Sequence, residues 1–333
     1  MKRTIFFLVF GMLVLNAQAK IWRVNNSPSV SADFSDLQVA MDGVNAGDTL
    51  YVEGSVTAYT SANDNFYVSK QQVIIGPGYL LNDNDSTLFN KSSATIGSQF
   101  SIKPTALGTQ LKGLVLNSFL WIGASNVTIQ RCIVANIQLG IYNTNNTNTK
   151  SNIINPTIIQ CLFQVLGAGG GWGTIGNNGL VSNNIIETGI SVDTGSLFIL
   201  NNTIGKGLGG NNANSLYTLN CTIQNNLIRG SIYEGAMSGA TYISANNTLS
   251  NNLTSTDNMF VGGTLRDKKH VLSTTSSAKG AGTGGVDCGA FGGSDPYVLS
   301  GLPAIPHIYV VVAPTSGSVT SGLVVKVKVK TQK

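Results

Sequence analysis

One short pattern of apolar and polar positions occurs six times between residues 129 and 254. Each copy has an apolar residue, two variable residues, Asn or Cys, and then two mostly apolar residues. The copies start at Ile129, Ile158, Val181, Ile199, Ile223 and Leu249, and their fourth positions are Cys132, Cys161, Asn184, Asn202, Asn226 and Asn252. Consecutive fourth positions are 18 to 29 residues apart. A constant unit with a spacer of variable length is typical of a solenoid, in which the unit forms a stacked coil and the spacer forms loops.

This spacing predicts an all-β fold, a right-handed parallel β-helix. A coil of 18 residues has room for two or three short strands but not for a helix. Each coil brings the chain back parallel to the previous coil, and such crossovers are almost always right-handed. The alternative architecture is an all-β sandwich of short strands, but a sandwich does not explain uneven spacing around a fixed Asn column.

The column of fourth positions predicts a ladder of side chains. An Asn amide at a tight corner can bond backbone groups and the next Asn in the stack, and Asn tolerates the left-handed backbone that such corners need. Cys132 and Cys161 stand in the same column. We expect them to fill it as small buried residues, because stacked neighbours have parallel Cβ vectors, which do not suit a disulfide.

Residues 20–58 are predicted to form an N-terminal cap on the coil stack. A strand at 21–24 is followed by an amphipathic helix over 34–45, with Asp33 or Ser35 as its N-cap. The apolar positions of this helix are Phe34, Leu37, Met41 and Val44. Such a helix would cover the open end of the stack, where unpaired backbone groups could otherwise recruit another chain.

Residues 1–19 are predicted to be a secretory signal. Lys2 and Arg3 give it a basic start, an apolar run covers residues 5–15, and residues 17–19 form an Ala-Gln-Ala cleavage site. The apolar run is too short to span a bilayer. We therefore expect an exported protein that is extracellular, at the cell surface or periplasmic, with no membrane span after signal cleavage.

Residues 59–300 are expected to form the parallel β-helix, and residues 301–333 a short C-terminal β segment. Near the end of this segment, valines alternate with lysines: Val325, Lys326, Val327, Lys328, Val329 and Lys330. The alternation predicts an edge strand with valines facing inward and lysines facing water, where they discourage aggregation. Attraction to a membrane surface is the alternative role of these lysines.

The sparse charge of the chain excludes several classes of partner. Charged residues make up 11% of the sequence, against about 25% in typical soluble domains. Apart from the basic start and four lysines among the last eight residues, 14 basic residues stand against 15 acidic ones, so no basic stripe is available for nucleic acid. With only His270 and His307 and no cluster of Cys or His, we expect no metal site and no cofactor.

Several segments resemble secreted right-handed parallel β-helix proteins of the pectin-lyase-like superfamily. Residues 34–40 and 46–52 look like the helix-then-strand opening of that superfamily. Residues 76–80, 284–293 and 296–303 are similar to segments of uncharacterised β-helix proteins exported by Bacteroidetes-type bacteria. The resemblance covers nearly the whole mature chain and implies the fold. Its motifs are structural, so they say little about activity.

The resemblance also brings an enzymatic hypothesis, because many enzymes with this fold cleave acidic polysaccharides. The hydrolases have clustered aspartates and a Gly-His-Gly element, and the lyases use Lys or Arg as the base, often with calcium held by several carboxylates. The sequence has no Asp-Asp pair, and neither histidine lies between residues 126 and 261. The four carboxylates in that stretch are too few to nominate the pair that a glycosidase needs.

One group of charged residues remains a candidate site. Glu187 and Arg229 follow their column Asn by three residues, and Lys206 follows its own by four. These positions are expected to share one face of three consecutive coils, with Glu234 nearby. The group is either a binding or catalytic face or an ordinary row of surface ion pairs, which contribute under about 1 kcal/mol each.

Aromatic residues are the second group of candidates, as platforms for a sugar ring. Trp172 stands in a glycine-rich loop, residues 167–177, and an aromatic ring beside a β-face can stack on a sugar. Further platforms are Tyr142, Tyr217, Tyr233 and Tyr242. In the alternative interpretation Trp172 folds back onto the solenoid and binds nothing.

These observations favour a secreted or cell-surface β-helix protein that is non-catalytic and either structural or glycan-binding. Its partner would be a polysaccharide or a cell-surface glycan. A polysaccharide lyase or a glycoside hydrolase is the first alternative. An adhesin-like module that binds a partner through the side of the solenoid is the second.

Overall fold

The computed structural model describes most of the chain. The described residues are 19–144, 147–168, 174–175, 178–208, 214–235, 246–320 and 322–332. The predicted signal, apart from its last residue, lies outside them. In the described part, no helix has the length and apolar character needed to cross a membrane.

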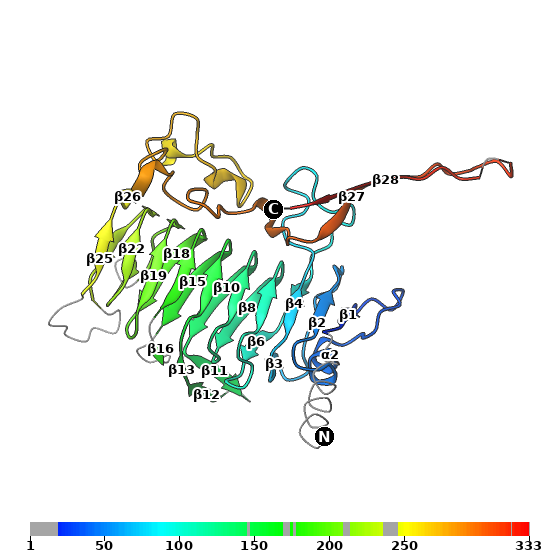
Figure 1. Cartoon of the computed structure of the whole chain (residues 1–333), viewed down its shortest axis with the longest axis horizontal. Helices are drawn as coiled ribbons and strands as arrows, with labels where there is room; N and C mark the ends of the chain where they lie inside the picture. Colours follow the sequence, from blue (N-terminus) through cyan, green and yellow to red (C-terminus); the bar gives the residue numbers. More distant parts are fainter. Residues whose placement is uncertain are drawn as a thin grey trace, which may run out of the picture.

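Two long parallel sheets form the body of the molecule (Figure 1). The first contains β1 (Ile21–Val24), β2 (Thr49–Val52), β4 (Val73–Ile75), β7 (Gln110–Lys112), β9 (Thr128–Gln130), β14 (Thr157–Ile159), β17 (Gly179–Ser182), β19 (Leu197–Leu200), β22 (Thr222–Gln224) and β25 (Thr248–Ser250). The path of the second contains β3 (Asn65–Val68), β6 (Gln99–Ile102), β8 (Val115–Ile122), β10 (Ile133–Leu139), β15 (Leu162–Ala168), β18 (Ile185–Val192), β20 (Thr203–Ile204), β23 (Leu227–Ile228) and β26 (Leu253–Thr254). Spatial order follows sequence order in both sheets, so the prediction of a parallel β-helix is confirmed.

Shorter strands complete the coils. β5 (Thr95–Ile96), β21 (Asn214–Tyr217) and β24 (Ser231–Tyr233) join the second sheet beside its main path. Two further pairs lie in the segments that lead from the second sheet back to the first. They are the hairpin of β11 (Ile141–Thr144) and β12 (Thr147–Lys150), and the parallel pair of β13 (Asn152–Ile153) and β16 (Thr174–Ile175). The stacked strands run from β1 to β26, so they begin within the predicted cap and end well before residue 300.

The first position of the repeat forms an inward file of aliphatic side chains. The register places Ile129, Ile158, Val181, Ile199, Ile223 and Leu249 on consecutive strands of the first sheet. All of them are fully buried except Leu249 in the last coil, which is 42% exposed. Burial of this file and its neighbours removes apolar surface from water and stabilises a tubular core.

The fourth position forms the predicted ladder. The backbone N–H of Asn184 donates to Oδ1 of Asn202 at 2.9 Å, that of Asn202 to Oδ1 of Asn226 at 2.8 Å, and that of Asn226 to Oδ1 of Asn252 at 3.1 Å. The Cys161 N–H donates to Oδ1 of Asn184 at 2.8 Å. Each Asn Nδ2 group also donates to a carbonyl of the preceding coil, as Asn202 does to Val181 O at 2.9 Å. All four cysteines are free and buried, which agrees with the packing role expected of the column cysteines.

The left-handed backbone lies one residue before the ladder. The third positions of the repeat are Arg131, Gln160, Asn183, Asn201, Asn225 and Asn251, and their φ angles lie between 50° and 57°. An Asn in the left-handed region costs less than most other non-glycine residues, because its short polar side chain can bond locally. Consecutive Asn residues therefore do different things: the third position turns the chain and the fourth satisfies buried backbone groups.

The N-terminal cap contains a shorter helix than predicted. α2 covers Leu37–Gly43, and Asp36 is its N-cap, accepting a hydrogen bond from Val39 N at 2.9 Å. The prediction of a helix over 34–45 with Asp33 or Ser35 as N-cap was wrong, because the preceding residues pair with β1. The Asp33 carboxylate accepts the Arg23 N–H at 2.7 Å, and Phe34 N donates to Arg23 O at 3.1 Å.

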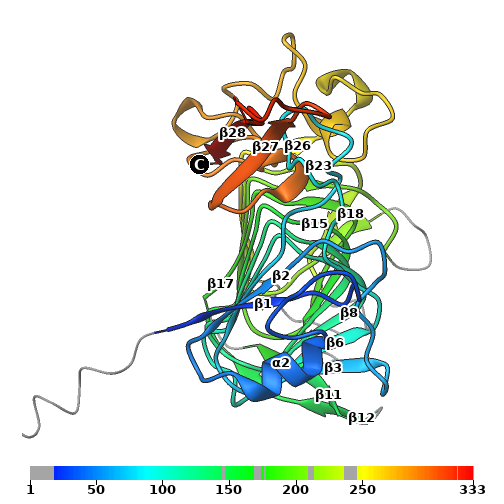
Figure 2. The ribbon, with the colours of Figure 1, turned by 90° about the vertical axis from the view of Figure 1, so that its right-hand side faces the viewer.

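The helix nevertheless covers the first coil as expected (Figure 2). Its Leu37, Ala40 and Met41 are buried. Gln38 bonds the free edge of β3 in both directions: its Nε2 donates to Tyr67 O at 3.1 Å, and its Oε1 accepts the Tyr67 N–H at 2.8 Å. A side-chain amide thus replaces the missing next strand.

After β26 the chain turns back along the corner between the two long sheets as a strap, residues 255–302 (Figures 1 and 2). The helical elements of the strap are 3₁₀ turns: η1 (Asp257–Met259), η2 (Lys268–His270), η3 (Thr283–Gly285) and η4 (Leu299–Gly301). Its Ala290 and Tyr297 pack with Tyr79, Leu162 and Ile185. The Tyr79 and Tyr297 hydroxyls are 2.5 Å apart in this buried contact.

The third positions of the repeat hold the strap. The Arg131 guanidinium donates to Leu302 O at 2.8 Å, Gln160 Nε2 to Pro296 O at 2.8 Å, and Asn183 Nδ2 to Gly292 O at 2.7 Å. Further along, Asn201 bonds Asp287 O, and both Asn225 and Asn251 bond Thr283. One file of residues therefore makes the corners and fixes the strap.

The chain ends in an antiparallel hairpin of β27 (Pro306–Val312) and β28 (Lys326–Thr331). The expectation that the valines face inward was wrong: Val325, Val327 and Val329 are 47%, 48% and 56% exposed. The reason is topological, because β28 pairs with β27 and not with a strand of the coil stack.

The ladder generates the first prediction. Replacing Asn202 by Leu should lower the free energy of unfolding by about 1–3 kcal/mol, because buried backbone groups lose their partner. Asn63→Leu, at an exposed site whose side chain makes no hydrogen bond within the described residues, is the control and should change stability little. Urea unfolding of both variants measures the difference; equal midpoints would argue against the ladder.

Candidate functional site

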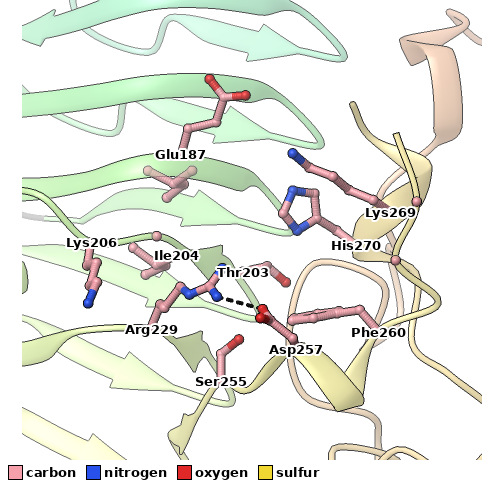
Figure 3. A pocket seen from close by; sticks show the side chains of 14 residues that line it. Glu187, Thr203, Ile204, Lys206, Arg229, Ser255, Asp257, Phe260, Lys269 and His270 are labelled. Carbon is pink, nitrogen blue, oxygen red and sulfur yellow. Dashed lines mark hydrogen bonds and ion pairs between the residues drawn. The ribbon is translucent and has the colours of Figure 1, made fainter. Parts of the chain in front are cut away.

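A groove lies where the strap crosses the last coils of the second sheet (Figure 3). Its volume is about 580 Å³. The wall from the coils includes Ile186, Glu187, Thr203, Ile204, Gly205, Lys206 and Arg229. The wall from the strap includes Ser255, Asp257, Phe260, Lys269 and His270. The charged residues of the groove therefore come from both the solenoid and the strap.

The structure brings Glu187, Lys206 and Arg229 into this one groove, as their spacing from the column suggested. They do not form a strict file. Gly205 N donates to Ile186 O and Arg229 N to Ile204 O, so Gly205 is stacked between Glu187 and Arg229. Lys206 is one residue further along its coil.

The acidic and basic residues of the coils pair with the strap and not with one another. Arg266 binds Glu187 in a bidentate manner, with both N–O distances at 2.8 Å. Burial alone would raise the pKa of Glu187, but the hydrogen bonds and the charge of Arg266 outweigh it and hold this pKa below its usual value. Arg229 pairs with Asp257 at 2.6 Å. The sequence suggested a row of ion pairs within the coils, but these two ion pairs join the coils to the strap.

The loop that carries Arg266 is fixed from below by Asp267. This carboxylate is fully buried. Its Oδ2 accepts the Ser300 N–H at 2.8 Å, and Asn84 Nδ2 approaches both of its oxygens at 3.3 and 3.4 Å. Arg266 and residues 268–270 are next to Asp267 in the sequence. The buried Asp267 carboxylate therefore fixes the position of these residues, although it does not face the groove itself.

Lys206 is a cation of the groove that remains available to a ligand. Its side chain is exposed, and in the described ranges it has neither a hydrogen bond nor an ion pair. With Lys269 it gives the groove two lysines beyond the paired arginine. A ligand could therefore receive hydrogen bonds from Lys206 without breaking a native interaction.

His270 is held in its neutral form. Burial, and then the positive charge of Lys269, lower its pKa from 6.5 to about 4. Its ring packs edge-on against Phe260, with centroids 5.8 Å apart. At neutral pH the imidazole is thus a hydrogen-bonding group and not a cation.

The arrangement suits binding better than acid–base catalysis. A general acid must be protonated at the working pH, but the pKa of Glu187 is lowered and the Asp257 carboxylate is bound to Arg229. Among the described residues, no group of three or more His, Cys, Asp or Glu side chains is placed to hold a metal ion.

The remaining predicted residues lie elsewhere. Glu234 is exposed outside the groove and accepts a hydrogen bond from Asn247 at 3.2 Å. Tyr217 and Tyr233 lie on the neighbouring strands β21 and β24, with ring centroids 5.1 Å apart. Tyr142, on β11, lies close to Gly123. Trp172 and Tyr242 are outside the described residues.

Sequence reasoning missed the half of the site that the strap supplies. Asp257, Phe260, Lys269 and His270, which line the groove, and Arg266, which binds Glu187, are not among the candidates from the sequence, although residues 266–269 form a charged Arg-Asp-Lys-Lys loop. The available signal was a cluster of charges in a chain with very few. The position of this cluster relative to Glu187 could not be predicted, because Arg266 and Glu187 are 79 residues apart in the sequence and meet only when the strap turns back along the coils.

Comparison with models of known families, with curated proteins and with solved structures finds no significant match. The fold and the groove are therefore the basis for any functional assignment.

The ion pair between Glu187 and Arg266 predicts an acid-dependent loss of stability. A carboxylate whose pKa is lower in the folded state than its unfolded value of about 4.3 stabilises the fold above that value, and this stabilisation is lost as the pH falls through the folded-state pKa. Glu187→Gln should be less stable than the wild type at pH 7, and the difference should narrow at pH 3. Chemical unfolding at both pH values measures this. Glu234→Gln, at a single exposed contact, is the matched control, and a difference that stays constant for Glu187→Gln would contradict the prediction.

His270 should titrate far below the ordinary range of histidine. We expect its ring signals to shift with a midpoint near pH 4, because the folded environment favours the neutral imidazole. The chain has two histidines, so nuclear magnetic resonance shows two sets of imidazole signals, and His270→Gln removes one set and thereby assigns it. A midpoint near pH 6.5 for that signal would show that the ring is not desolvated.

Proposed function

We propose that this protein is an exported β-helix protein that binds a glycan in the groove between its last coils and its strap. The proposal combines the secretory signal expected from residues 1–19 with the pectin-lyase-like resemblance of the sequence. It places the protein outside the cell, at the cell surface or in the periplasm. The partner is a polysaccharide or a cell-surface glycan.

The chemistry of the groove supports a sugar ligand. A volume of about 580 Å³ falls within the range of small-ligand sites, roughly 300–1,000 Å³. Lys206, Lys269 and the neutral His270 offer hydrogen bonds to hydroxyl groups, and Phe260 offers an apolar ring face. Polar groups around an aromatic ring match the two kinds of surface of a sugar.

The ion pairing of the groove is the observation that favours binding over turnover. Glu187 is held by Arg266, and Asp257 by Arg229. A hydrolase needs one carboxylic acid that donates a proton and a second group that attacks or activates water. Two carboxylates that are each bound to an arginine do not supply this pair.

A polysaccharide lyase is the second candidate, and His270 is the reason to keep it. A neutral imidazole can accept a proton, and Lys206 could stabilise a developing negative charge. The low pKa that keeps the ring neutral also makes it a weak base. Binding therefore remains the favoured function.

A glycan array followed by calorimetry tests this proposal. We expect binding of at least one extracellular polysaccharide, and Lys206→Ala should weaken it about tenfold by removing one charge-assisted hydrogen bond. Lys279→Ala, at an exposed lysine outside the groove, is the control and should bind as the wild type does.

The same ligands separate binding from catalysis. Neither new reducing ends nor the absorbance of unsaturated products should appear over long incubation. Product formation that disappears in His270→Gln or Lys206→Ala would replace the binding proposal with the lyase. Binding that ignores Lys206 would move the ligand away from the groove.

A further inference from the structure

The C-terminal hairpin presents two chemically different faces. Cross-strand pairing puts Ile308 opposite Val329 and Val311 opposite Val327, which makes one face apolar. The other face carries Lys326, Lys328 and Lys330, because the side chains of a strand alternate. Ile308 is 45% exposed, and Val327 and Val329 are exposed to a similar degree. The hairpin lies beside the coil stack and is not part of either long sheet (Figures 1 and 2).

One edge of this hairpin is open. β27 is approached on its outer side by residue 89, where Phe89 N donates to Ile308 O at 2.8 Å. β28 pairs only with β27 in the part of the chain that the structure describes. A sheet of two strands is marginally stable by itself and gains from a third strand. The outer edge of β28 therefore offers backbone hydrogen bonds to an added strand.

The charge of this segment selects the kind of strand. The chain has no Asp or Glu after Asp295, so Lys326 and Lys328 have no acidic neighbour in their own segment, whereas Lys330 lines a pocket with Asp85 and Asp295. Lys330 lies 5.5 Å over the Tyr309 ring, whereas Lys326 and Lys328 have no side-chain contact that the structure records among its described residues. A strand beside β28 would place every second side chain next to these lysines and the others next to the valines.

We propose that the free edge of β28 binds an extended acidic segment of a partner protein, in which Glu or Asp alternates with apolar residues. The segment adds as a third strand. Its backbone bonds the edge of β28, its carboxylates pair with Lys326 and Lys328, and its apolar side chains extend the face formed by Val327 and Val329. Main-chain hydrogen bonds provide affinity, and the alternate side chains provide selectivity.

A second copy of this chain is a poorer occupant. Pairing β28 with another β28 in the register that matches valine with valine also brings lysine next to lysine. Like charges directly opposite each other on neighbouring strands are destabilising. Lysines on an edge strand are a common device against self-pairing. The same charges that disfavour a second copy favour an acidic partner.

The test uses the full mature protein and two labelled peptides, one alternating Glu and Val and the other alternating Lys and Val. Fluorescence anisotropy should show binding of the Glu–Val peptide, weaker at high salt, and no binding of the Lys–Val peptide. The triple variant K326E/K328E/K330E should reverse this preference. The single variant K328E should bind the Glu–Val peptide about tenfold more weakly, and K279E, at an exposed lysine away from the hairpin, should bind it as the wild type does.

A Glu–Val peptide with N-methylated backbone amides separates strand addition from simple charge attraction. It keeps the carboxylates but lacks the N–H groups that a third strand needs, so its binding should be lost. Equal binding of the methylated peptide would overturn the proposal, as would equal binding of the Glu–Val peptide to the triple variant. A concentration-dependent dimer in light scattering that the triple variant abolishes would identify a second copy as the occupant. Binding to phosphatidylserine vesicles without peptide binding would identify a membrane surface instead.

Discussion

The corner between the two long sheets is the constraint on which the rest of this molecule depends. A parallel β-helix must turn sharply in every coil, and the backbone at the turn is buried on one side. This chain solves the turn with two adjacent residues. The third position of the repeat adopts the left-handed conformation, and the fourth provides an amide or a thiol that bonds the neighbouring coils. Neither residue can do the work of the other, since one side chain points outward and the other inward.

The outward residue of each corner also explains where the site is. Arg131, Gln160 and Asn183 bond the backbone of the strap, so the strap runs parallel to the file of corners. Glu187 and Arg229, the charged groove residues of the coils, come only a few residues after a corner residue in the sequence, on the second sheet. The strap and the charges of the coils are therefore brought together by one repeated structural element. The ion pairs of Glu187 with Arg266 and of Arg229 with Asp257 join the two parts at this place.

Several elements could be predicted from the sequence because they depend on contacts between equivalent positions. The ladder residue Asn202 contacts Asn184 and Asn226, and all three occupy the same place in the repeat. The cap helix could be predicted from its apolar spacing, but its start could not. Asp33 and Asp36 are equally suited to be the N-cap. Asp36 has this role because the Asp33 carboxylate already accepts a hydrogen bond from the Arg23 backbone N–H. The alternation of Val327 and Lys328 predicts a strand correctly, but not which surface the strand joins.

The sequence by itself determined that this protein is a solenoid of parallel strands, because a solenoid repeats its contacts at every coil and each repeat is visible in the chain. It also predicted that Glu187, Lys206 and Arg229 lie close together, since each is a short distance from the column, and all three line the groove. The tertiary structure alone decided what those residues meet. Arg266 reaches Glu187, and His270 reaches the groove, through a strap that reverses direction and is held by single contacts, such as that of Asp267 with Ser300. Such contacts occur once in the chain and join residues far apart, so no periodic pattern encodes them.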